Sequence, residues 1–389
     1  MRLLHTSDWH LGRSLHRSDL RSAQGAFLDH LVDVVRSERV DAVLVAGDVY
    51  DRAVPPVDAV ELFESALVRL RQAGSRVVLI SGNHDSARRL GFGSRLVDVA
   101  GVHLKTRPAE CGDPVLLSDD HGEVAVYGIP YLEPEAVRTS LPADPADPGA
   151  DVPRGHVGVL GRGLACVRAD AAARAARRTV VLAHAWVTGG AASDSERDVT
   201  VGGVASVPAS LFDGFTYSAL GHLHGPQVLS PSLRYSGSPL AYSFSEAEHV
   251  KGSWLVELDA AGLSRVEHVP SPVPRRLSTV CGTLDELLGS PAFAAQEQDW
   301  LTAVYTDALR PPDAMDRLTV RFPHVLVLRH EPEGSTPDGL SYGARVTGRT
   351  DVQVGAAFVE HVRRTPLEPT ERLLLEQALE AARREPASA

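Results

Sequence analysis

The sequence predicts an α/β protein whose β-sheets are covered by helices. Five short apolar runs, rich in branched residues, are typical of strands that are buried on both faces. They are "MRLLHTSDWH", "VDAVLVAGDVYD", "SRVVLISGNHD", "RTVVLAHAW" and "FTYSALGHLH". Segments with apolar residues at helical spacing separate the first three of these runs. Buried strands that alternate with amphipathic helices indicate a layered α/β domain.

The first two helices are predicted from the spacing of their apolar residues. The two patterns are Phe27, Leu31, Val34 and Val35, and then Val60, Phe63, Leu67 and Leu70. The second pattern begins after Pro55-Pro56 and ends at Gly74. Because proline at the start and glycine after the end are helix boundary signals, we expect a helix between them.

Three domains are expected along the chain. The main domain covers residues 1–270, includes an exposed loop at 139–155, and ends with a hairpin in "SEAEHVKGSWLVELDAAGLSRVEHVP". After the linker "PSPVPRR", residues 277–345 are predicted to form a small α+β domain, with strands in "WLTAVYTD" and "HVLVLRH". Residues 350–389 are predicted to form C-terminal helices, because "TDVQ" has the form of a capping box.

Composition bounds the class of protein. The chain has 389 residues, of which 43% are hydrophobic and 23% charged, and a net charge of −11. No stretch is long and apolar enough for a membrane span, so a cytoplasmic protein is expected. Three cysteines without ligand spacing fit a reducing compartment. The acidic charge disfavours tight nucleic-acid binding by the chain as a whole.

Polar residues follow all five predicted strands, and they are the candidate site. They are Asp8, His10, Asp48, Asn83, His84, His184, His222 and His224. In α/β sheets ligands bind at the carboxyl ends of the strands, so we expect these side chains to share one rim. If the "DWH" and "HLH" segments are extended, residues one apart point to the same side.

These side chains offer oxygen and nitrogen ligands without sulfur, which favours Mn²⁺, Fe²⁺ or Zn²⁺. Without His84, seven ligands remain, which are too many for one tetrahedral ion and suit two ions that share a carboxylate. Two ions about 3.5–4 Å apart activate water and neutralise phosphoryl oxygens. The reaction class predicted from the residues is therefore phosphoester hydrolysis.

The blocks "DWH", "GD", "GNHD", "H" and "GHLH", in this order, resemble the calcineurin-like metallophosphoesterase family. Within it, "HTSDWHLGRSLH", "GDVYDRAVPP", "SGNHDS", "ALGHLHGPQ" and "YSGSPLAYSF" closely resemble the SbcD nucleases of bacterial SbcCD complexes. The resemblance is strong over residues 1–276. It implies two β-sheets sandwiched by helices, with a capping domain and C-terminal helices after them.

The resemblance also implies roles for the candidate residues. One ion would be held by Asp8, His10 and His224, and the other by Asn83, His184 and His222, with Asp48 bridging them. His84 would be the catalytic residue, protonating the leaving 3′ oxygen or stabilising charge on the phosphate. Asp51 would hydrogen-bond a ligand histidine. The cofactor would be two Mn²⁺ ions, with Mg²⁺, Fe²⁺ or Zn²⁺ as alternatives.

The activity implied is Mn²⁺-dependent DNA cleavage, as a 3′–5′ exonuclease on double strands and an endonuclease on single strands and hairpins. The implied partners are DNA, an SbcC-type ATPase bound by the C-terminal helices, and a second copy of the chain within a heterotetramer.

The residues alone leave alternatives open. His184 could be a hydrogen-bonded core histidine, and Arg13 and Arg17 either contact DNA phosphates or lie in a charged surface loop. The apolar stripe at 375–382 could pack on its own domain. Rival functions are another dinuclear phosphoesterase, either a phosphatase or a phosphodiesterase, and a non-catalytic scaffold with the same fold.

Overall fold

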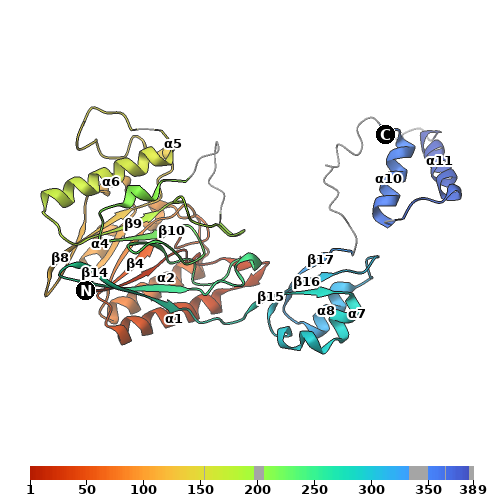
Figure 1. Cartoon of the computed structure of the whole chain (residues 1–389), viewed down its shortest axis with the longest axis horizontal. Coiled ribbons are helices and arrows are strands. Elements are labelled where there is room, and N and C mark those ends of the chain that lie inside the picture. Colours follow the sequence, from red (N-terminus) through yellow and green to blue (C-terminus); the bar gives the residue numbers. More distant parts are fainter. Residues whose placement is uncertain (153, 197–205, 333–348, 364, 385–389) are drawn as a thin grey trace. The chain divides into compact units, whose positions relative to one another are not determined.

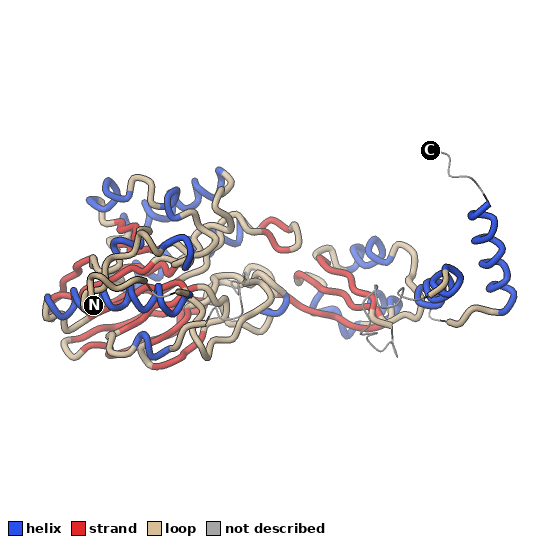
Figure 2. Tube along the Cα trace, turned by 90° about the horizontal axis from the view of Figure 1, so that it is seen from above, coloured by secondary structure: helices blue, strands red, loops and turns tan. Residues whose placement is uncertain are grey.

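The computed structural model describes residues 1–152, 154–196, 206–332, 349–363 and 365–384. The chain divides into two compact units, Met1–Arg276 and Leu277–Ala389 (Figure 1). The first contains two six-stranded sheets and a two-stranded hairpin, and the second a three-stranded sheet, counted over the described residues. Figure 2 shows helices on the outside of the sheets in the first unit.

The first sheet has the order β14-β13-β1-β4-β5-β6. Its strands are β1 (Arg2–Thr6), β4 (Ala42–Ala46), β5 (Arg76–Ile80), β6 (Val102–Lys105), β13 (Gly252–Asp259) and β14 (Gly262–Pro270). The first four are parallel, and β13 and β14 form the antiparallel hairpin that the sequence predicts. Helices α1 (Arg21–Glu38) and α2 (Val57–Gln72) pack on one face of this sheet through a shared apolar core.

The second sheet has the order β11-β12-β10-β9-β8-β7. Its strands are β7 (Val115–Asp119), β8 (Gly122–Ile129), β9 (Thr179–His184), β10 (Tyr217–Gly221), β11 (Gln227–Ser230) and β12 (Leu233–Tyr235). Strands β8, β9, β10 and β12 are parallel. Helix α6 (Gly155–Ala173) packs on the outer face of this sheet.

The two sheets face each other across a third apolar core. Along β4, Ala42 and Leu44 belong to the core between the sheets, whereas Val43 and Val45 belong to the core under the helices. Alternate side chains of a strand point to opposite faces, so a strand in this position must be apolar throughout. This confirms the prediction of two sheets sandwiched by helices.

Shorter elements complete the first unit. They are β2 (Ser14–Leu15), β3 (Ser18–Asp19), α3 (Ala87–Leu90), α4 (Ser94–Val99), α5 (Pro134–Val137) and the 3₁₀ turns Pro108–Glu110, Ala209–Phe212 and Phe244–Glu246.

His5 joins the two sheets. It lies on β1, is fully buried, and its Nδ1 and Nε2 lie 2.9 Å from the Tyr217 hydroxyl and 3.1 Å from the Leu220 carbonyl oxygen of β10. Burial lowers the pKa of His5 to about 3, so its imidazole stays neutral in the folded protein.

The substitution His5→Leu is expected to destabilise the metal-free protein by about 2–4 kcal/mol at pH 7.5. It removes the hydrogen-bond partner of two buried groups, the Tyr217 hydroxyl and the Leu220 carbonyl oxygen. Below pH 6.5 His5 binds a proton in the unfolded wild type but not in the folded wild type, so the stability of the wild type decreases as the pH is lowered. The difference between the two proteins should therefore shrink by about 2 kcal/mol at pH 5. Urea unfolding in EDTA at both pH values measures it, with exposed His121→Leu as the control. An equal difference at both pH values would contradict a neutral His5.

The second unit begins with alternating strands and helices. They are β15 (Leu277–Gly282), α7 (Leu284–Gly289), the 3₁₀ segment Pro291–Gln296, β16 (Trp300–Tyr305), α8 (Ala314–Arg321) and β17 (Val325–His330). The helix and the two strands predicted for this segment are present, and all three strands of the sheet are parallel. The helices between successive strands return the chain to the same end of the sheet, which permits parallel pairing. Residues 333–345 of the predicted domain lie outside the described residues.

Two helices follow in the same unit, α10 (Asp351–Arg363) and α11 (Pro369–Arg384). The predicted capping box is present, since the Gln353 side chain accepts from the Thr350 amide at 2.9 Å and the Thr350 hydroxyl accepts from the Gln353 amide at 3.3 Å. Across the part of the chain that the structure describes, no helix combines the length and apolar character needed to cross a bilayer.

Candidate metal centre

The candidate residues lie at the carboxyl ends of adjacent strands from both sheets. Strands β1, β4 and β5 end at Thr6, Ala46 and Ile80, and the segments that follow carry the first five of the candidates. His184 is the last residue of β9, and β10 ends at Gly221, directly before His222. The two sheets therefore bring all five chain segments to one rim, as expected from their parallel strands.

The extended conformation assumed for "DWH" and "HLH" is wrong. Asp8, His10, Asp48 and His222 have φ values of 53°, 44°, 47° and 107°, in the region that L-residues with side chains seldom adopt. The chain turns sharply after each strand, so alternation along a strand does not set the direction of these side chains. Unusual backbone at this many candidate residues is typical of a functional site.

Two glycines permit the close approach of these segments. A Cβ atom at Gly221 would collide with the Ala46 carbonyl oxygen at the end of β4, and one at Gly82 would collide with the Asp48 carboxylate. Because only glycine lacks that atom, the ends of β4, β5 and β10 can converge.

Two groups of nitrogen and oxygen atoms converge at the rim. In the first, the Nε2 atoms of His10 and His224 lie 3.0 Å apart, and Asp8 is close enough to share an ion with both. In the second, Asn83 Oδ1 lies 2.8 Å from His184 Nε2 and 3.1 Å from His222 Nδ1. His222 and His224 thus serve different groups, although they are separated by one residue.

Asp48 lies between the two groups. Its Oδ2 atom is 3.7 Å from His10 Nε2 and 3.5 Å from His184 Nε2. Its Oδ1 atom accepts a hydrogen bond of 2.8 Å from the His84 amide, which fixes the carboxylate. One carboxylate that reaches both groups has the placement that a bridging ligand requires.

The charges at the rim fit divalent cations. Asp8 and Asp48 are buried, and burial together with the Asp48 charge raises the pKa of Asp8 well above its usual value. Burial, and then neighbouring histidines, lower the pKa of His10 and His222. Neutral imidazoles cannot balance two buried carboxylates, which are costly without a counter-charge. Among the described residues, His10 Nδ1 and Asn83 Nδ2 are also buried without a hydrogen-bond partner.

His84 lies beside the rim with its ring held from behind. Its Nδ1 is 2.7 Å from the Asp51 carbonyl oxygen, so Nδ1 donates to that oxygen and Nε2 is the ring nitrogen outside this contact. The Asp51 carboxylate lies 3.8 Å from Arg13 Nε. The contact between Asp51 and His84 is made by the main-chain carbonyl oxygen of Asp51. The predicted hydrogen bond between Asp51 and a ligand histidine stays a prediction, because His84 is not one of the seven predicted ligands.

Sequence reasoning missed two carboxylates that organise the rim. The Asp85 carboxylate accepts hydrogen bonds from the amides of Val49, Tyr50 and Gly82, and so ties the segments after β4 and β5 together. The position of Asp85 in "GNHD" was a signal that could have identified it. Glu246 is buried beside His224, and no motif in the sequence identified it, because the contact between Glu246 and His224 joins two separate loops.

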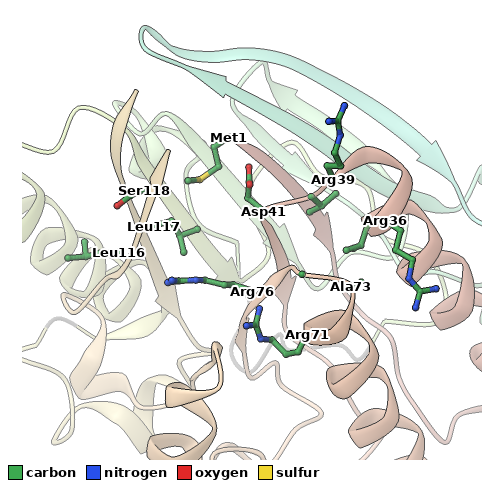
Figure 3. Close-up of a pocket in the computed structure, with 13 residues that line it drawn as sticks. Met1, Arg36, Arg39, Asp41, Arg71, Ala73, Arg76, Leu116, Leu117 and Ser118 are labelled. Atoms are coloured by element: carbon green, nitrogen blue, oxygen red, sulfur yellow. The ribbon is translucent and has the colours of Figure 1, made fainter. Parts of the chain in front are cut away.

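A further hollow lies away from this rim, at the opposite ends of β4 and β5. It has a volume of about 480 Å³ and its lining includes Arg36, Arg39, Arg71 and Arg76. Figure 3 shows the guanidinium groups of Arg36 and Arg39 pointing in different directions. The arginines of this pocket do not converge on one point, and the pocket is not part of the candidate centre.

Comparisons with known proteins identify the family. Residues 1–226, more than half of the chain, match the model of the calcineurin-like phosphoesterases. Similar solved structures include TT1561 of Thermus thermophilus, at 12% identity over 69% of this chain and 98% of that one, with a TM-score of 0.39. A dimetal phosphatase from Danio rerio has 13% identity over 70% and 99%, with a TM-score of 0.39. GAP50, the anchor in the inner membrane complex of Plasmodium, has 10% identity over 86% and 98%, with a TM-score of 0.39. By its match to the family model, this chain belongs to the calcineurin-like phosphoesterase family.

Proposed function

We propose that the chain is an SbcD-type nuclease that hydrolyses DNA phosphodiesters with two Mn²⁺ ions. It acts in the cytoplasm as a 3′–5′ exonuclease on double strands and an endonuclease on single strands and hairpins. It works with an SbcC-type ATPase in DNA end processing, repair and recombination. The sequence blocks named above and the surroundings of His84 support this activity.

The observation that carries the proposal is a basic cavity beside His84. It has a volume of about 490 Å³ and is lined by Arg13, Ser14, Asp51, Arg52 and His84. The Arg52 side chain is 65% exposed, and its ion pair with Asp51 is long, at 3.7 Å. It is therefore available to a DNA phosphate, as a guanidinium binds phosphate oxygens well. The cavity thus has a local excess of positive charge, although the chain as a whole is acidic.

The side chains at the rim supply complementary functions. Bound divalent ions activate water and neutralise the phosphoryl group. Asp8, His10 and His224 would hold one ion and Asn83, His184 and His222 the other, with the Asp48 carboxylate within reach of both groups of ligands. His84 donates its Nδ1–H to the Asp51 carbonyl oxygen, and in its imidazolium form it would also carry a proton on Nε2, which would pass to the leaving 3′ oxygen and leave the ring neutral. Mn²⁺ suits this set of imidazole and oxygen ligands.

The experiment that tests the function compares three substrates in Mn²⁺, with and without an SbcC-type ATPase. They are a DNA hairpin, bis-p-nitrophenyl phosphate and p-nitrophenyl phosphate. We expect hairpin cleavage, and we expect Arg52→Gln to weaken DNA binding and reduce its salt slope by about 1, leaving the small diester unaffected. Hydrolysis of the monoester without any DNA cleavage would identify a phosphatase and overturn the proposal. Absence of all turnover would favour a scaffold.

A second copy of the chain is part of the proposal. Phe92, Leu96 and Val99, on and before α4, are 88%, 81% and 91% exposed, which is unusual for large apolar side chains. The last turn of α2 is tied to the residue after α4, since Arg71 Nε donates to the Ala100 carbonyl oxygen at 2.6 Å. A two-fold contact between copies would bury this apolar surface.

The substitution Leu96→Glu is expected to convert the dimer into monomers, because two carboxylates would be buried near the two-fold axis. Light scattering after size-exclusion chromatography measures the mass, and exposed Val320→Glu in the second unit is the control. A wild type with the mass of one chain at micromolar concentration would contradict the dimer.

The ATPase partner is assigned to the two C-terminal helices. Phe358 of α10 and Leu373 and Leu374 of α11 are exposed apolar residues. The helices contact each other, and Arg363 forms an ion pair of 2.5 Å with Glu371. A helical pair with exposed apolar residues suits binding to a partner helix.

A further inference from the structure

Glu246 is buried completely, yet its carboxylate is surrounded by hydrogen-bond donors. Its Oε1 atom accepts from the hydroxyl groups of Ser193, at 3.0 Å, and Ser195. Its Oε2 atom lies 2.5 Å from the Lys251 ammonium and accepts from the Tyr242 amide at 3.2 Å. A carboxylate held from several sides in this way has a fixed position and a compensated charge.

This carboxylate lies directly behind His224. The Ser195 hydroxyl oxygen is 2.5 Å from His224 Nδ1, and Glu246 Oε1 is 3.4 Å from the same nitrogen. The Glu246 carboxylate can only accept, so Ser195 gives it the hydroxyl proton. The lone pair of Ser195 then accepts from His224, which places a proton on Nδ1. The neutral ring is thereby left with a bare Nε2 atom, the one that faces His10 at 3.0 Å.

The backbone of His224 is held by residues of the same two loops, those around 195 and 246. The His224 amide donates to Glu196 Oε1 at 2.7 Å, and Lys251 Nζ donates to the His224 carbonyl oxygen at 2.8 Å. The ring and both backbone polar groups of one candidate ligand are thus fixed by residues from the loops around 195 and 246.

We propose that Ser195 and Glu246 are positioning residues for the metal ligand His224. They fix its tautomer and ring direction, so that Nε2 is ready to bind the ion shared with Asp8 and His10. Metal-binding histidines commonly donate their other N–H to such a partner, and losing that partner typically weakens metal affinity about 10–100-fold. The inference rests on the metal centre and not on the nature of the substrate.

The test is Mn²⁺ binding by titration calorimetry to the full chain. Wild type is expected to bind two ions. Ser195→Ala and Glu246→Gln should each weaken one of the two sites about 10–100-fold and leave the other unchanged. Ser195→Thr, which keeps the hydroxyl, should restore binding. Glu248→Gln changes an exposed carboxylate two residues away and is the control.

Glu246→Gln also leaves Lys251 without its buried partner, so its thermal unfolding is measured first. If this variant fails to fold, Ser195→Ala and Ser195→Thr decide the question alone. Wild-type affinity at both sites in Ser195→Ala would overturn the proposal, as would equal weakening in Ser195→Thr. If wild type binds two ions normally but hydrolyses no phosphodiester, the proposed function is wrong and this inference is unaffected.

Discussion

Asp48→Asn is expected to remove hydrolysis of every phosphodiester and to weaken binding of both metal ions. The Asp48 carboxylate lies within 3.7 Å of His10 and 3.5 Å of His184, so its charge serves both groups of ligands. The loss of Mn²⁺ affinity should exceed the roughly 10–100-fold that accompanies loss of a partner behind a ligand. Calorimetric titration and turnover of bis-p-nitrophenyl phosphate measure the two effects.

The same variant should show the opposite effect on stability without metal. Burial, and then the charge of Asp48, raises the pKa of Asp8, so the two carboxylates repel each other when both are ionised and no cation is present. Removing one charge should leave the protein in EDTA at least as stable as wild type. Wild type should gain about 2.7 kcal/mol per site at Mn²⁺ concentrations 100-fold above Kd, and the variant should gain far less.

Thermal unfolding with and without Mn²⁺ is the measurement, and Asp58→Asn, an exposed carboxylate at the start of α2, is the control. A full metal-dependent increase in Tm for Asp48→Asn would exclude Asp48 from the centre.

His84→Ser is expected to lower kcat for DNA by about 10²–10⁴-fold, because it removes the group that we propose as the proton donor to the leaving 3′ oxygen. The loss should be much smaller with bis-p-nitrophenyl phosphate, since nitrophenolate leaves without a proton. The Mn²⁺ isotherm should still show two ions. His121→Ser, which alters an exposed histidine, should match wild type in all three measurements.

The isotherm is decisive because His84 also lies within reach of an ion shared with His10 and Asp48. Loss of one bound ion in His84→Ser would make His84 a ligand, and an equal loss of rate on both substrates would contradict the acid role.

Much of the fold was predictable because its strands are encoded locally. The run "VDAVLVAGD" is apolar at every position of β4, and a strand covered by a sheet on one face and helices on the other requires this. The polar residues after such strands were predictable for the same reason, as were the hairpin before residue 270 and the capping box at 350–353.

The sequence by itself therefore determined the α/β class, the strand ends and the types of candidate ligand. The tertiary structure alone decided how they meet. It places Asp48 between two groups of ligands, turns Asp8 and His222 through positive φ values, and brings Ser195 and Glu246 behind His224. These contacts join residues far apart in the chain, and periodicity carries information only about neighbours along one element. The parallel pairing of β15–β17 was likewise decided by the crossover helices and not by the apolar pattern of any strand.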